Sequence, residues 1–103
     1  MTNKNFMVIE WLEFDVPLEQ RNAFIERDRE VWTKGLKQFK GFIGKEVWID
    51  SVTQRVVLVI RWESQQAWDA VPQATIEQLD RQMADLSIPI AKSNKYQVRK
   101  YLQ

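Results

Sequence analysis

The sequence predicts an α+β domain whose elements follow the order β-α-β-β-α-β, and three observations lead to this prediction. The chain has 103 residues, which is the usual size of one domain. Four short segments are apolar on both faces or alternate between apolar and polar residues, as strands do. Two longer stretches repeat their apolar residues at helical spacing, and they follow the first and the third of these segments.

The first strand is expected over residues 6–15, which are apolar on both faces through their first half, as in a central strand covered on two sides. Pro17 suits the first turn of a helix, and Glu19 follows near the positive end of the helix dipole. Helical spacing then continues over residues 18–38, and Gly41 is expected to end the helix. The apolar residues of this predicted helix are Leu18, Phe24, Ile25, Val31, Trp32 and Leu36.

The other three strands are expected over residues 43–50, 56–63 and 95–102. The first two of them are separated by residues 51–55, a length that suits a hairpin. The last one alternates its apolar and polar residues, which indicates a more exposed strand.

Two helices are expected between the third and the fourth strand. Ser64 is a favourable N-cap for a short helix over residues 65–71. Thr75 and Gln78 have the spacing of a capping box, which predicts a second helix over residues 76–86.

This order of elements is the ferredoxin-like arrangement, in which four antiparallel strands form one sheet and the helices cover one of its faces. The first three strands also offer apolar or aromatic residues to the other face, and an exposed patch of this kind is typical of an interface. We therefore expect a homodimer in which two sheets pack face to face, forming a dimeric α+β barrel. One domain is expected over residues 1–103.

The composition excludes several functional classes. The chain contains no Cys and no His, which excludes disulfides, thiolate nucleophiles, His-ligated haem and catalysis by imidazole. Its 15 Lys and Arg stand against 14 Asp and Glu, and this net charge of +1 argues against a nucleic-acid partner. The sequence has no long apolar run and no apolar leader in residues 1–6, so we expect a cytoplasmic protein without a membrane segment. We expect neither a cofactor nor a metal ion.

Asp28 is the most unusual residue of the first helix, because it lies near the middle of the apolar stripe. Burying an unpaired carboxylate costs several kcal/mol, so the acid must be paired or protonated. One interpretation is a catalytic general base with a raised pKa, in a pocket between helix and sheet. The other is a structural acid at the edge of the stripe, paired with Arg29, with Arg61 or with a backbone donor.

Charged residues also interrupt the strand segments that are expected to be buried: Glu10, Lys45, Glu46 and Arg61. Some of these side chains must point into the interior if two sheets close on each other. They could form a structural network of ion pairs that fixes the strand register and the dimer. Alternatively, they could orient a small ligand in a polar pocket.

The sequence contains five Trp, which either build an aromatic core or form the walls of a pocket for a flat aromatic ligand or a porphyrin. No glycine-rich nucleotide-binding motif is present, and the third strand lacks the aromatic pair of RNA-recognition modules. If a pocket exists, the residues expected to bind its ligand are Trp11, Trp32, Trp48, Arg61 and Trp62, with Asp28 as the catalytic residue.

Two stretches resemble the antibiotic-biosynthesis-monooxygenase-like family of dimeric α+β barrels. These are residues 40–48 (KGFIGKEVW), with a Gly-Phe turn that opens the second strand, and residues 59–68 (VIRWESQQAW), with a Trp-x-Ser-x-x-Ala-aromatic pattern. The order of elements is similar over nearly the whole chain, and the sequence is most similar to a branch of small cyanobacterial proteins of unknown function.

The resemblance implies a homodimer with one ligand pocket per subunit, between the sheet and the helices. It also implies activities that range from cofactor-independent oxygenation of polycyclic aromatics to haem degradation, or no activity. The sequence departs from the family pattern at two positions: Val71, followed by Pro72, stands where members often have a His or, in the haem-degrading branch, a Trp, and Trp11 replaces a pocket Asn. The axial His of the haem-degrading branch is also missing.

Two functional classes follow. The first is a cofactor-independent monooxygenase or proton-transfer enzyme acting on a small aromatic substrate, with Asp28 as the base and Arg61 stabilising an enolate or phenolate. The second is a non-catalytic dimeric module that binds a small molecule or regulates a partner.

Overall fold

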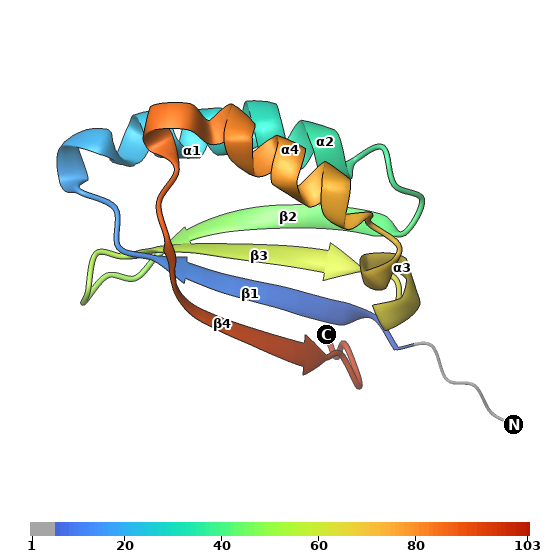
Figure 1. Cartoon of the computed structure of the whole chain (residues 1–103). Helices are drawn as coiled ribbons and strands as arrows, with labels where there is room; N and C mark the ends of the chain where they lie inside the picture. The colour runs from blue at the N-terminus through green and yellow to red at the C-terminus, as the bar shows by residue number, and fades with distance from the viewer. Residues whose placement is uncertain (1–5) are drawn as a thin grey trace, which may run out of the picture.

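The computed structural model describes residues 6–103 of the chain (Figure 1). The prediction about the polar start of the chain, residues 1–6, therefore lies outside the described residues except for Phe6. In chain order the elements are β1 (Val8–Phe14), η1 (Leu18–Gln20), α1 (Arg21–Asp28), η2 (Arg29–Thr33), α2 (Lys34–Leu36), β2 (Phe42–Ile49), β3 (Val56–Trp62), α3 (Gln65–Asp69), α4 (Gln73–Met83), η3 (Ala84–Leu86) and β4 (Ile90–Gln97).

The four strands form one antiparallel sheet in the order β2-β3-β1-β4, and the long helices lie together on one face of it (Figure 1). This is the predicted ferredoxin-like α+β fold. The predicted hairpin also joins β2 to β3, and the first strand is central, as its two apolar faces indicated. Within residues 6–103, no helix is both long enough and apolar enough to cross a membrane.

The strand register sorts the side chains into two faces. On the face toward the helices, alternate residues of β3 pack into the main core with Phe24 from α1 and Leu79 from α4. Trp62, at the end of β3, is 1% exposed and meets the ring of Phe42 edge to face. On the other face, which we call the open face, Val57 and Val59 form a smaller buried cluster.

The predicted first helix is observed as one continuous helical segment of four parts, which begins after Pro17. Its middle part, η2, is a π-helix that starts directly after Asp28. A π-turn inserts a residue into the helix, and such turns are frequent at functional sites. The insertion shifts the helical phase between Asp28 and the residues that follow it.

Gly41 does not end the helix through a left-handed conformation, since no glycine has a positive φ among the described residues. Instead it lets α3 approach closely, because a Cβ at this position would lie 2.1 Å from the Cβ of Ala67. The carbonyl of Gly41 also accepts a hydrogen bond of 2.8 Å from the backbone N–H of Glu63. The prediction identified an important glycine but gave the wrong reason for it.

For the two helices after β3, the predicted start of α3 is confirmed and the predicted start of α4 is wrong. The hydroxyl of Ser64 accepts a hydrogen bond of 3.1 Å from the backbone N–H of Ala67, as an N-cap does. In contrast, α4 begins at Gln73, directly after Pro72, and no side chain caps it. The capping box predicted at Thr75 is not used, because the fixed φ of proline already starts the helix three residues earlier.

The last strand was predicted too late in the chain: β4 covers Ile90–Gln97 instead of residues 95–102. It pairs with β1 over nearly its whole length, from Ile90 opposite Phe14 to Gln97 opposite Val8. β4 is an edge strand and most of its side chains are exposed, so backbone pairing decides its position. The alternation of apolar and polar residues indicates which strands are buried on one face. It therefore did not reveal β4, whose side chains are mostly exposed.

Candidate functional site

A cavity of about 200 Å³ lies between the helices and the sheet. Most of its wall is apolar or aromatic, which is typical of a site for a small organic ligand. The lining residues come from all four strands, from the helical segments and from the link into β4: Glu10, Leu12, Phe14, Phe24, Asp28, Trp32, Leu36, Lys45, Leu58, Ile60, Trp62, Trp68, Val71, Ile76, Asp80, Met83, Ser87, Ile88 and Ile90.

The floor of the cavity carries a row of residues that are in register across the sheet. Lys45 of β2 pairs with Ile60 of β3, Ile60 pairs with Glu10 of β1, and Glu10 pairs with Lys95 of β4. Neighbouring strands are about 4.8 Å apart, so Lys45 and Glu10 are separated by about two such spacings, with Ile60 between them. Two charged groups therefore face the cavity on either side of an apolar centre.

Asp28 reaches the cavity from the last turn of α1 and forms an ion pair with Lys45. Both side chains are only 3% exposed. Burial raises the pKa of Asp28, and the nearby ammonium of Lys45 opposes part of that rise. The predicted burial of Asp28 is confirmed, but its partner is neither Arg29 nor Arg61.

Glu10 is the second acid at the cavity, and it is partly buried. Its Oε1 accepts a hydrogen bond of 3.2 Å from the indole Nε1 of Trp62. Burial raises the pKa of Glu10, while the hydrogen bond from Trp62 and the charge of Lys45 lower it. Within residues 6–103, this is the only hydrogen bond that the structure gives to the carboxyl of Glu10.

The structure divides the residues that were predicted to bind a ligand. Trp32 and Trp62 line the cavity, as Asp28 does. Trp11, Trp48 and Arg61 are instead on the open face, because the strand register pairs them with Val59, Val57 and Ile9, respectively, which form the smaller cluster there. One pocket therefore does not collect all five residues.

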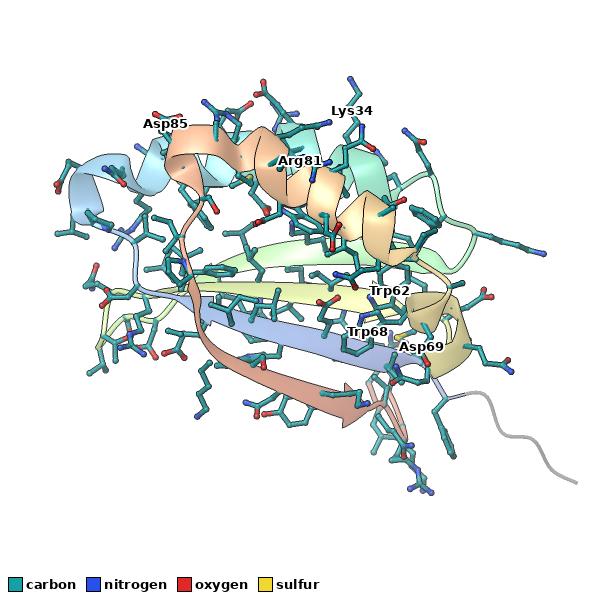
Figure 2. The ribbon with its side chains drawn as sticks, in the orientation of Figure 1. Lys34, Trp62, Trp68, Asp69, Arg81 and Asp85 are labelled. Atoms are coloured by element: carbon teal, nitrogen blue, oxygen red, sulfur yellow. The ribbon has the colours of Figure 1, made fainter. Side chains whose placement is uncertain are left out.

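Glu10, Lys45 and Trp68 are among the lining residues that were not in the predicted ligand-binding set. Glu10 and Lys45 were noticed only as charges inside strands, and Trp68 only as one of five tryptophans. Trp62 and Trp68 both line the cavity at the end of the sheet where α3 lies (Figure 2). The useful signal was parity: Glu10 has the same parity in β1 as the core residues Val8 and Leu12, whereas Trp11 does not.

The prediction that Trp11 takes the place of a pocket Asn is corrected by the same parity argument. The side chains of β1 that face the cavity belong to Glu10, Leu12 and Phe14, whereas Trp11 packs on the open face with the smaller cluster. The cavity thus holds a carboxyl at this point of the first strand. No group of three or more potential metal-binding side chains occurs in the part of the chain that the structure describes.

Solved structures share this fold at low sequence identity. A haem-degrading protein from Mycobacterium tuberculosis, with two haems bound in its active site, has a TM-score of 0.75 and 18% identity over 93% of this chain and 99% of its own. A monooxygenase from Streptomyces coelicolor, in complex with nanaomycin D, has a TM-score of 0.69 and 18% identity over 96% and 91%. A conserved protein of unknown function from Bacteroides thetaiotaomicron has a TM-score of 0.69 and 18% identity over 92% and 100%.

No curated protein sequence matches the chain. The model of one family, antibiotic biosynthesis monooxygenase, matches residues 7–75, which include β1, all four parts of the first helical segment, β2, β3 and α3. This span contains both stretches on which the resemblance was based and most of the cavity wall. The chain belongs to the antibiotic biosynthesis monooxygenase family.

Proposed function

We propose that this protein binds a small aromatic molecule in the cavity and oxidises it without a cofactor. The observation that supports this function is the cavity itself, an apolar and aromatic chamber into which the ionisable side chains of Glu10, Asp28 and Lys45 point. A buried carboxylate can remove a proton from an acidic aromatic substrate and leave an electron-rich anion. Dioxygen would then convert the ring carbon para to the anionic oxygen, which is a CH₂ group in the keto tautomer, into a carbonyl, and the second oxygen atom would be released as water.

The volume of the cavity limits the size of the ligand. A cavity of about 150 Å³ holds benzene, so the volume seen here suits one or two aromatic rings. Haem does not fit, because a porphyrin is several times larger than benzene and the chain offers no His ligand. We therefore assign no step to haem, and we propose that the reaction needs no other cofactor.

A non-catalytic binding module is the second candidate, and the ion pair between Asp28 and Lys45 favours it. An acid that already has a buried cation as its partner has a sufficient structural explanation. In that case the same cavity would bind an aromatic metabolite without converting it. The two candidates share the ligand class and differ only in turnover.

The test is titration with phenol and 1-naphthol, followed by tryptophan fluorescence and isothermal titration calorimetry, with oxygen uptake measured in parallel. We expect quenching and saturable binding, because Trp32 and Trp62 line the cavity. Ile76→Trp should fill the cavity and abolish binding, whereas Ala74→Trp, on the exposed side of the same helix, should not. Binding that survives Ile76→Trp would contradict the site, and binding without oxygen uptake would favour the second candidate.

We also propose that the protein is a homodimer joined through the open face of the sheet. Trp48 is 46% exposed there and Tyr96 is 50% exposed, although Val57 and Val59 beneath them are buried. Light scattering should give twice the mass of the 12.3 kDa chain. Trp48→Glu should give a folded monomer, and Lys34→Glu on the outer helical surface should leave the dimer intact (Figure 2). A cytoplasmic location and a place in a cyanobacterial branch remain predictions.

A further inference from the structure

The geometry points to Glu10 as the residue that takes the proton from a hydroxyl-bearing aromatic ligand, with Lys45 facing the resulting phenolate and Asp28 acting as a positioning residue for Lys45. This inference rests on the proposed binding of a small aromatic molecule in the cavity. It differs from the sequence-based prediction, which gave the role of base to Asp28.

The first argument is the difference between the partners of the two acids. Asp28 is paired with Lys45, and both side chains are almost completely buried, so the pair is neutral as a unit. Among residues 6–103, Glu10 has one hydrogen-bond donor, the neutral indole of Trp62. A carboxylate can accept about four hydrogen bonds, so Glu10 retains the capacity to accept one from a ligand hydroxyl.

The second argument is the row across the floor of the cavity. Glu10 and Lys45 lie on either side of Ile60, so a ring lying on Ile60 can have one polar end at each charged group. A hydroxyl at the first end would donate to the carboxylate of Glu10. After transfer of the proton, the negative charge is delocalised over the ring, toward the ammonium of Lys45.

The proton transfer is balanced within the site. The O–H bond of the ligand breaks, an O–H bond forms on Glu10, and no electrons are gained or lost. The total charge of the site and its ligand does not change, because the carboxylate becomes neutral as the phenol becomes an anion. Ligands with a hydroxyl, such as phenols and naphthols, are therefore the class that this cavity selects over plain hydrocarbons.

Several charged groups surround Glu10 and influence its titration. Lys45 and Asp28 face it from β2 and α1, Asp80 lines the cavity from α4, and Lys95 is its neighbour on β4. The ammonium of Lys95 lies 5.8 Å from the ring centre of Trp68, beside the same end of the cavity. Burial raises the pKa of Glu10, which brings its basicity closer to that of an acidic phenol.

The probe for this inference is 4-nitrophenol, because its phenolate absorbs visible light and its phenol form does not. Below the pKa of the free ligand, we expect the ligand bound to the wild-type protein to show phenolate absorbance. Glu10→Gln should abolish that absorbance and weaken binding about tenfold, since a hydrogen bond to a charged group is lost. Glu77→Gln, an exposed control on α4, should keep the phenolate band unchanged. Asp28→Asn should keep Glu10 as the proton acceptor but shift the pH at which the band appears, because it frees the ammonium of Lys45.

The outcomes separate this inference from the proposed function. If the wild-type protein does not bind 4-nitrophenol, phenol or naphthol, the proposed function fails. If it binds them and Glu10→Gln retains the phenolate band, Glu10 is not the proton acceptor; loss of the band in Asp28→Asn alone would assign that role to Asp28. Should Glu10→Gln not fold, the carbon-13 shift of the Glu10 carboxyl in the wild-type protein replaces it, and this shift must report protonation when ligand binds.

Discussion

The two faces of the sheet carry nearly the same chemical groups in different surroundings. On the cavity face, the indole of Trp62 donates to Glu10 over 3.2 Å, and Lys45 forms an ion pair with Asp28. On the open face, the indole of Trp48 donates to Glu46 over 2.8 Å, and Arg61 lies 3.5 Å from the same carboxylate.

The polar groups of the two faces differ in how far they are buried. The ion pair of the cavity face is 3% exposed at both side chains, whereas Arg61 and Glu46 are 35% and 51% exposed. Water screens the pair of Arg61 and Glu46, and it solvates either partner when the other is removed. Water does neither for the buried pair of Asp28 and Lys45. The pKa of each cavity-face acid is raised by burial for the same reason. Matched substitutions on the two faces should show how much this difference in burial changes the free energy of unfolding.

The largest effect is expected from breaking the ion pairs. Lys45→Met leaves Asp28 buried without its cation and should lower the free energy of unfolding by about 3–5 kcal/mol. Arg61→Met, its counterpart on the open face, should cost less than about 1 kcal/mol. Urea unfolding followed by circular dichroism measures both values.

A double variant tests the cause of the larger loss. Asp28→Leu combined with Lys45→Met removes both charges, and it should recover most of the stability that Lys45→Met alone loses. A double variant as unstable as the single one would mean that packing of the lysine stem matters more than its charge. If the open face joins two subunits, any further cost of Arg61→Met should depend on protein concentration, whereas that of Lys45→Met should not.

A smaller effect is expected from the two indole donors. Trp62→Phe removes the indole donor to Glu10 and should lower the free energy of unfolding by about 1–3 kcal/mol, because the partly buried carboxyl loses its hydrogen bond from a buried donor. Trp48→Phe removes a donor that water can replace, and the subunit should lose less than about 0.5 kcal/mol. Thermal unfolding of both variants at one protein concentration gives the comparison, and equal losses would remove the distinction between the faces.

The smallest effect is a slope of stability against pH. The folded protein raises the pKa of Glu10 and Asp28 above their unfolded values, so it binds more protons than the unfolded chain between those values. Stability should therefore fall as pH rises through this window, by at most about 1.4 kcal/mol per pH unit for each carboxyl.

Variants assign that slope to its source. Glu10→Gln should flatten the slope by removing one of the two groups. Asp50, in the exposed hairpin, has a lowered pKa because the backbone N–H groups of Thr53 and Val52 donate to it. Its contribution has the opposite sign and is lost as pH falls below the unfolded pKa of Asp, about 3.9, so Asp50→Asn should make the slope more negative in that acidic range only.

Strong local signals predicted most of the fold. The order of elements, the central first strand, the hairpin and the cap at Ser64 all follow from residues close together in the chain. The start of α4 and the place of β4 were wrong, because Pro72 overrode a plausible capping box and an exposed edge strand has no apolar pattern. Asp28 was recognised as buried, but its partner Lys45 is 17 residues away and could not be identified from spacing.

By itself, the sequence determined the family, the α+β fold and the absence of any chemistry that needs Cys or His, because these depend on composition and on short-range patterns. Only the tertiary structure decided which side chains line the same cavity. A strand shows its two faces through alternation, yet nothing local says which face the helices cover. That choice placed Glu10 and Trp62 in the cavity and Trp11, Trp48 and Arg61 on the open face, since successive side chains of a strand point to opposite sides.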